Sequence, residues 1–168
     1  MEVLFENSFT RDEELAKELC TYLHFRRPFM IVFFAVMLAI VDWLAYMDIM
    51  YGMFTWFGYA FAALYVGLKF YQYFTSVKRM MARDAEAGMD NIVVSSTVTE
   101  DALQYHSLGS TCPAVELTHM KRWVTTKNYI FLCSKTKMLY CFSKKGFTKG
   151  SEEAFYQFLT EKGISHGR

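Results

Sequence analysis

One carboxylate, Asp42, lies inside a long apolar segment and is the residue of this sequence best suited to chemistry in a membrane. If the segment is helical, a rise of about 1.5 Å per residue puts Asp42 roughly 20 Å from Phe29, in the outer half of a bilayer. An ionisable group at that depth is costly and suggests a proton or ion site. A hydrogen bond to Tyr59 or Tyr65 of a second apolar segment would explain Asp42 without transport. We favour this structural role, because two helices alone cannot enclose an ion pathway.

Basic side chains form two groups that membrane lipids or a protein partner could contact. The groups are Lys78, Arg79 and Arg83, and Lys144, Lys145 and Lys149. Near an anionic leaflet, each such charge contributes about 1 kcal/mol of attraction. The first group follows the second apolar segment and would emerge from the membrane itself, so it is the better placed. A solvated loop is the simpler interpretation of the second group.

No arrangement of residues in the sequence predicts catalysis, a metal site or a cofactor. The histidines are scattered, and no serine, cysteine or aspartate stands at a catalytic spacing or in a phosphate-binding loop. The net charge of +1 is far from the basic stripe of a nucleic-acid-binding protein. We therefore expect a protein that is not an enzyme, holds no cofactor or metal, and does not bind nucleic acid.

Two apolar segments, residues 29–50 and 54–74, must position Asp42 and the tyrosines. About 20 apolar residues in a helix span the 30 Å bilayer core, and only three residues separate the segments, which predicts a two-helix transmembrane hairpin. Arg26 and Arg27 precede it and basic residues follow it. The positive-inside rule then predicts a cell-membrane protein with two spans and both termini in the cytoplasm. Small residues four apart, such as Ala35 and Ala39, favour close packing within the hairpin or in a homo-oligomer.

Residues 1–28 are predicted to form a cytoplasmic strand and helix. The strand covers residues 3–9, and Thr10 with Glu13 forms a capping-box pattern that would start the helix. The apolar face of this helix would consist of Leu15, Leu19, Tyr22 and Leu23. After the hairpin, residues 75–90 predict a cytoplasmic stalk whose helix stops near Gly88.

Residues 91–168 are predicted to form a small antiparallel β-domain. The expected strands are residues 91–99, 102–108, 113–118, 121–126, 129–134 and 138–143, with a hairpin tip at 134–137. A loop at 144–150 then leads to a helix capped by Ser151, with Ala154, Phe155, Phe158 and Leu159 on one face. A sheet closed by a C-terminal helix is the outline of a PH-like fold, so the fold class is α+β. The strand at 3–9 would supply a further strand, in which case deleting residues 2–9 would destabilise this domain.

In a reducing cytoplasm, the cysteines of this domain are expected to be free thiols that pack as small hydrophobic side chains. They are Cys112, Cys133 and Cys141.

Three segments of the C-terminal half resemble the YcxB-like family of small bacterial membrane proteins. These segments are 116–124, 127–132, and 142–147 with the closing helix 151–159. The order of these elements carries most of the resemblance, which implies two N-terminal membrane helices and a cytoplasmic PH-like domain over residues 91–168. Ser143 stands where the family favours proline. The family has no established reaction, so the resemblance concerns architecture rather than activity.

Together these patterns predict a non-enzymatic, membrane-anchored binding or regulatory module that presents a cytoplasmic domain to a protein partner or to anionic lipid. The alternative is an immunity- or stress-type integral membrane protein that acts through its hairpin. Asp42 separates the two hypotheses, because its replacement by leucine should spare a function of the domain and damage a function of the hairpin.

Overall fold

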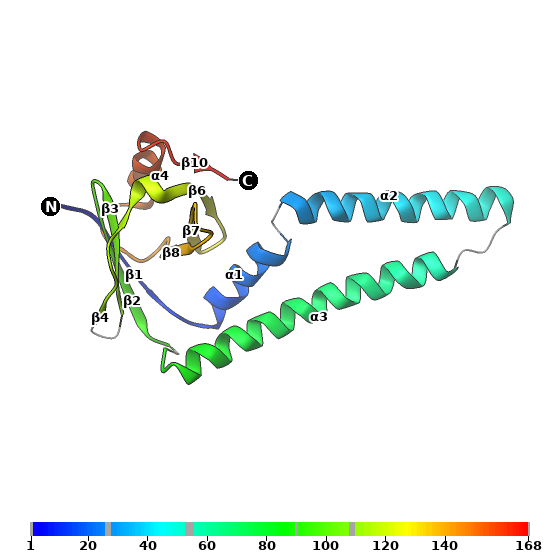
Figure 1. Cartoon of the computed structure of the whole chain (residues 1–168), viewed down its shortest axis with the longest axis horizontal. Helices are drawn as coiled ribbons and strands as arrows, with labels where there is room; N and C mark the ends of the chain where they lie inside the picture. The colour runs from blue at the N-terminus through cyan, green and yellow to red at the C-terminus, as the bar shows by residue number, and fades with distance from the viewer. Residues whose placement is uncertain (1, 26–27, 53–55, 90, 108–109, 168) are drawn as a thin grey trace.

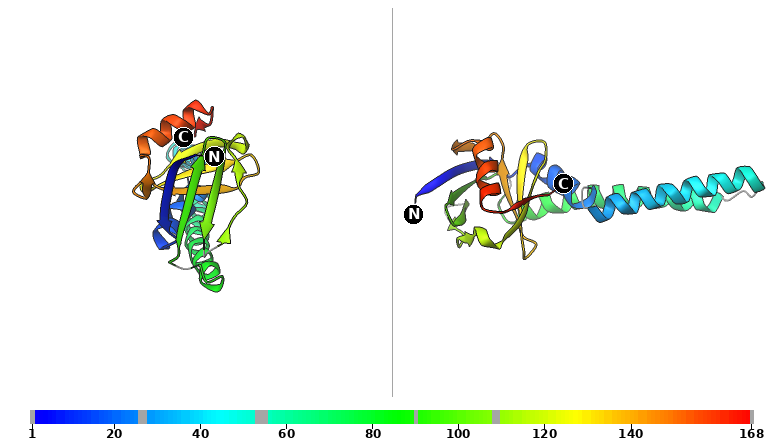
Figure 2. Two further views of the ribbon diagram at one scale, coloured as in Figure 1. Left: turned by 90° about the vertical axis from the view of Figure 1, so that its left-hand side faces the viewer. Right: turned by 90° about the horizontal axis from the view of Figure 1, so that it is seen from above.

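The computed structural model describes residues 2–25, 28–52, 56–89, 91–107 and 110–167 and has an α+β fold. Its helices are α1 (Glu13–Phe25), α2 (Pro28–Tyr51), α3 (Trp56–Glu86) and α4 (Glu152–Glu161). A β-domain lies at one end, and the long helices α2 and α3 extend away from it (Figure 1). The right-hand view of Figure 2 shows the same two regions from above.

The β-domain consists of two sheets rather than the single sheet expected. The larger sheet has the order β4-β3-β2-β1-β9, with β5 paired to β3, and the smaller has the order β10-β6-β7-β8. The strands of the first are β1 (Val3–Thr10), β2 (Val93–Thr99), β3 (Ala102–Ser107), β4 (Ser110–Thr111), β5 (Val115–Glu116) and β9 (Phe147–Lys149). Those of the second are β6 (Met120–Thr125), β7 (Tyr129–Ser134), β8 (Leu139–Ser143) and β10 (Ser165–His166).

The N-terminal strand belongs to this domain, as its alternating apolar residues allow. β1 lies between β2 and β9 and pairs antiparallel with both. Phe5 and Phe9 of β1 are buried, and so are Val94 and Val98 of β2 opposite them. The side chains of alternate residues point to one face of a strand, so this face of β1 completes the core.

Several local boundaries differ from the prediction. Thr10 is part of β1, and Asp12 caps α1 instead, because its Oδ1 accepts the backbone N–H of Leu15 at 2.9 Å. The expected strand 113–118 is the two-residue β5 followed by a 3₁₀ turn, Leu117–His119. The expected loop 144–150 contains β9, while the short strands β4 and β10 were not predicted. The hairpin tip at 134–137 is confirmed by the bond from the Lys137 N–H to the Ser134 carbonyl.

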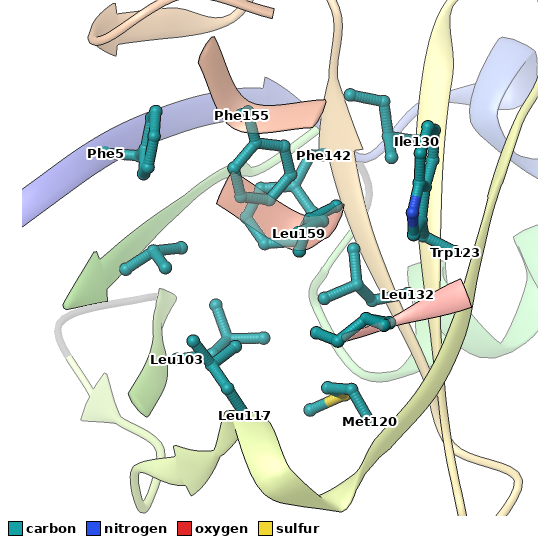
Figure 3. Close-up of a cluster of buried hydrophobic side chains, with 12 residues drawn as sticks. Phe5, Leu103, Leu117, Met120, Trp123, Ile130, Leu132, Phe142, Phe155 and Leu159 are labelled. Atoms are coloured by element: carbon teal, nitrogen blue, oxygen red, sulfur yellow. The ribbon is translucent and has the colours of Figure 1, made fainter. Parts of the chain in front are cut away.

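Helix α4 closes one end of the domain over a dense cluster of aromatic and aliphatic side chains (Figure 3). Phe142, Phe155 and Leu159 have no exposed surface, and the Phe5 ring meets the Phe155 ring edge-on with centroids 5.2 Å apart. The Ser151 side chain accepts the Ala154 N–H at 3.2 Å, which confirms the predicted cap. Ala154 itself is exposed, so its predicted place on the buried face was wrong.

Side chains of the larger sheet satisfy the free backbone groups of β8, an edge strand. The Asn7 side chain donates to the Ser143 carbonyl at 2.7 Å and accepts the Ser143 N–H at 2.9 Å. The Tyr105 hydroxyl donates to the Cys141 carbonyl at 2.6 Å. Buried backbone groups need partners, so these bonds join the two sheets where no strand pairs with β8.

Helix α1 lies between the β-domain and α3. Its predicted apolar face packs on the domain, where Leu15 and Tyr22 are buried and Leu19 and Leu23 partly so. A second face places Ala16 and Cys20 against Val77 of α3. Because α1 contacts both the β-domain and α3, it has apolar residues on two sides.

The predicted thiols have different environments. All are free, and Cys133 is buried and Cys141 half-buried, as expected of packed thiols. Cys112 is exposed, so its expected burial was wrong. It is the residue directly after β4.

Helices α2 and α3 run antiparallel beside each other (Figure 1). One described segment, Val32–Tyr51 within α2, is long and apolar enough to cross a membrane by length and composition. The described part of α3 does not meet this test, because tyrosines, Lys69 and Gln72 interrupt its apolar run. The fold therefore shows one candidate span, not the predicted two. Helix α3 ends near Gly88 as predicted, where a φ of +64° favours glycine.

Candidate functional site

Asp42 is exposed on α2, and the described residues include no hydrogen-bond or ion-pair partner for it. In the part of the chain that the structure describes, no hydrogen bond joins Asp42 to Tyr59 or Tyr65, although the sequence predicted one. The Tyr59 hydroxyl instead bonds to Asp48, which lies nearer the turn between the helices. A helix rotates by about 100° per residue, so the six-residue step from Asp42 to Asp48 puts their side chains on different faces.

The contacts of Tyr65 are with aromatic and cationic neighbours. Its ring lies 4.8 Å from the Phe33 ring of α2, and Lys69 Nζ lies 5.5 Å from the Tyr65 centroid. The small residues of α2 and α3 lie partly on the faces where the two helices meet and partly on their outer faces. Gly58 packs against Leu44, where a side chain would collide, whereas Ala35 and Ala39 are exposed. Ala35 and Ala39 are therefore free for contact with another helix.

The cations of α3 are exposed beyond its apolar part. None of Lys78, Arg79 and Arg83 makes an ion pair with the described residues. The neighbouring Val77 is buried against α1. Helix α3 therefore turns one side to α1 and a basic side to the surroundings.

The loop cations are held largely by the domain itself. Lys144 Nζ lies 3.5 Å from Glu152 Oε1, and Lys149 Nζ donates to the Val3 carbonyl at 2.5 Å. Lys145 is exposed. Lys144 and Lys149 thus contact other parts of the domain, whereas the Lys145 side chain makes no ion pair or hydrogen bond with the described residues.

Two polar contacts join α3 to the two ends of α1, and no sequence pattern indicated them. Arg11 Nε donates to Asp84 Oδ2 at 2.7 Å, with side chains 35% and 14% exposed. His24 Nε2 lies 3.1 Å from Ser76 Oγ near the other end of α1. These partners are 73 and 52 residues apart. Periodicity reports local structure only and could not have found them.

Sequence reasoning also missed a cavity of about 650 Å³ at the end of the domain that α1 covers. Its walls come from β3, β8, α1 and the residues around the end of α3. Burial raises the pKa of the Tyr105 hydroxyl and of the Cys141 thiol well above their ordinary values, so both stay neutral. Among the described residues, Arg11 is the one charged side chain that lines the cavity.

Comparisons of the chain with protein-family models, with curated proteins and with solved structures found no match. The resemblance to YcxB-like proteins accordingly stays a prediction.

Proposed function

We propose that this chain is a non-enzymatic binding module of the cell membrane, in which α2 and α3 both span the bilayer and hold the β-domain at its cytoplasmic surface. The domain would engage a protein partner or anionic lipid there.

The pairing of β1 with β2 carries this proposal. β1 precedes α2 and β2 follows α3, yet the two strands pair from Val3 opposite Thr99 to Thr10 opposite Val93. If α2 crosses the bilayer, the chain must cross back before β2, and α3 is the only described helix between them. The interruptions of α3 by tyrosine and Lys69 are compatible with a span, because such side chains settle at the interface or extend toward it.

The surface of the helical pair supports the same proposal. Outside Val93 and Met138, every exposed large hydrophobic side chain of the described residues lies on α2 or α3. Exposed apolar area on this scale is unusual for a soluble protein and typical of a surface that faces lipid or another protein.

The length of α3 explains how the domain would be held near the headgroups. At about 1.5 Å per residue its 31 residues extend about 46 Å, roughly 16 Å more than the bilayer core. The excess contains Lys78, Arg79 and Arg83, whose charges would face the anionic leaflet. These charges also favour the cytoplasmic orientation.

Labelling with a membrane-impermeant maleimide tests the two spans. A Tyr51→Cys variant in a Cys112→Ser background reports the turn, and Cys112 of the unmodified chain reports the domain, because both positions are exposed. In intact spheroplasts we expect labelling at position 51 and not at Cys112, which should react only after lysis. Labelling of Cys112 in intact spheroplasts would refute the proposed orientation.

Lipid retention tests the basic side of α3. The chain is reconstituted in nanodiscs that contain phosphatidylglycerol, and native mass spectrometry counts the lipids that stay bound. We expect Lys78→Gln/Arg79→Gln/Arg83→Gln to retain fewer anionic lipids than the unmodified chain. The control removes three lysines outside α3: Lys127, Lys135 and Lys137. Equal retention in both variants would leave a protein as the partner.

A further inference from the structure

The cavity at the α1 end of the β-domain results from the way this end is closed. At the opposite end, α4 fills the space between the sheets with phenylalanine and leucine side chains. Helix α1 also has to contact α3, so it offers only Leu15 and Leu19 to the cavity. The space beside the β8 edge is left open, and its volume of about 650 Å³ is typical of sites for small ligands.

The chemistry of the walls selects an apolar ligand. Leu103 and Phe131 form the buried floor, and Tyr105, though polar, has its hydroxyl committed to β8. Methionines from three separate segments, Met80, Met89 and Met138, stand around the cavity. Flexible thioether side chains adapt to ligands of variable shape.

Arg11 gives the cavity one polar anchor. Its Nε is bonded to Asp84, while its two terminal nitrogens donate to no described group. A planar guanidinium binds a carboxylate or phosphate oxygen through these N–H groups. The cavity therefore combines an apolar interior with a single cationic donor, which is complementary to an amphiphile with an anionic head.

We propose that the cavity binds one acyl chain of an anionic amphiphile, with its head at Arg11. The argument that this ligand comes from the membrane rests on the proposed function. Met80 lies six residues beyond Phe74, about 9 Å along α3, so acyl chains would be the apolar ligands most abundant near the cavity. The walls come from both α3 and the domain, so an occupant would bridge the membrane helices and the β-domain.

Photolabelling of the full chain in nanodiscs tests the proposal. The probe is a long-chain fatty acid with a diazirine near its end, and the readout is the labelled tryptic peptides. Residues 138–144 form one such peptide, and Met138, Leu139, Tyr140 and Cys141 within it line the cavity. We expect saturable label in this peptide that unlabelled fatty acid displaces.

Two valines provide a matched pair of variants. Val115→Trp places a large side chain in the cavity and should abolish the label in peptide 138–144. Val93→Trp makes the same change at an exposed site outside the cavity and should leave the label intact. Thermal unfolding of both variants shows whether they fold. Equal labelling of the two folded variants would overturn the proposal.

The role of Arg11 is tested without leaving Asp84 unpaired. In Arg11→Gln/Asp84→Asn, the fatty acid should label peptide 138–144 no better than the corresponding fatty alcohol. Arg79→Gln removes a cation nearer the membrane and should preserve the preference for the acid. If the unmodified chain shows no such preference, the anionic head is excluded. A phospholipid with the same diazirine chain tells a bilayer lipid from a free fatty acid.

Label in the one long tryptic peptide that contains α2 separates the two proposals, because no Lys or Arg lies between Arg27 and Lys69. It reports bulk lipid around the helices, as the proposed function requires, in every variant. Label in α2 without label in peptide 138–144 overturns the cavity proposal alone, whereas absence from α2 contradicts the membrane location.

Discussion

The two ends of the β-domain are closed by helices, but the two helices pack very differently. At the α4 end, Phe142, Phe155 and Leu159 are completely buried in one hydrophobic cluster. At the α1 end, Leu15 and Tyr22 are buried, yet a cavity of about 650 Å³ remains. A helix with one partner can fill the space below it, whereas a helix shared between the domain and α3 cannot. The tightly packed cluster and the cavity therefore lie at different ends of the domain.

The largest effect is expected at the α4 end. Phe155→Ala removes a fully buried ring that contacts Phe5, Phe142 and Phe147. Such changes lower the free energy of unfolding by about 3–5 kcal/mol. Urea denaturation followed by Trp123 fluorescence measures it, since Trp123 stacks on Tyr156 of α4 with centroids 4.7 Å apart.

The tryptophans of the helical pair are replaced by phenylalanine in this assay, so that the fluorescence reports the domain alone. A loss below about 1 kcal/mol would mean that the cluster can collapse around the missing ring, and the contrast between the two ends would fail.

The next prediction compares one substitution at both ends. Leu159→Ala at the fully buried α4 site should cost about 2–5 kcal/mol. Leu19→Ala in α1 should cost roughly 1 kcal/mol or less, because this partly buried side chain already borders a cavity. The same denaturation assay measures both. Equal costs would show that the α1 end is as tightly packed as the α4 end.

Asn7 tests the contact between the two sheets, which lies between the α1 end and the α4 end of the domain. Asn7→Ala leaves the N–H and the carbonyl of the half-buried Ser143 without their side-chain partner, which should cost about 1–3 kcal/mol where water does not replace the lost bonds. Hydrogen exchange should also accelerate at the Ser143 amide. Ser95→Ala is the control, a polar residue of the neighbouring strand that is only partly buried. Unchanged exchange in Asn7→Ala would mean that water replaces the amide.

The sequence predicts the local elements well, because strand alternation and helix caps act over a few residues. Strand β7 has the expected bounds, and Ser151 caps α4. The division into two sheets and the salt bridge between Arg11 and Asp84 depend on residues far apart in the chain. No periodicity encodes such contacts, and the cavity, as a space between elements, has no sequence pattern at all.

Asp42 illustrates the same limit within the helical pair. Its depth follows from counting residues, but the face it occupies depends on how α2 packs on α3. The structure turns Asp42 outward and pairs Tyr59 with Asp48. The number of spans could not be read from hydropathy alone either, and the argument for a second span comes from the pairing of β1 with β2.

A small effect is also expected from a single hydroxyl at the α1 end. Tyr105→Phe keeps the ring but removes the bond to the Cys141 carbonyl, which should cost about 1 kcal/mol at neutral pH. Tyr140→Phe is the matched control, because the Tyr140 ring stacks on Tyr105 and its hydroxyl has no hydrogen bond to the described residues. Denaturation of both variants at pH 7 measures the difference, and equal stability would contradict a structural role for the bond.

The cost of Tyr105→Phe in the free energy of unfolding should also depend on pH, in a direction that can be predicted. Burial raises the pKa of Tyr105 in the folded chain well above its ordinary value, so its contribution to stability is fully present below the unfolded pKa of about 10. As the pH rises above 10, the unfolded chain releases a proton that the folded chain keeps, and the unmodified protein loses stability. Tyr105→Phe cannot lose this proton, so the cost of the substitution should shrink and then reverse above pH 10. A cost that stays constant with pH would mean that the hydroxyl is open to solvent, and the α1 end would then be looser than the cavity alone indicates.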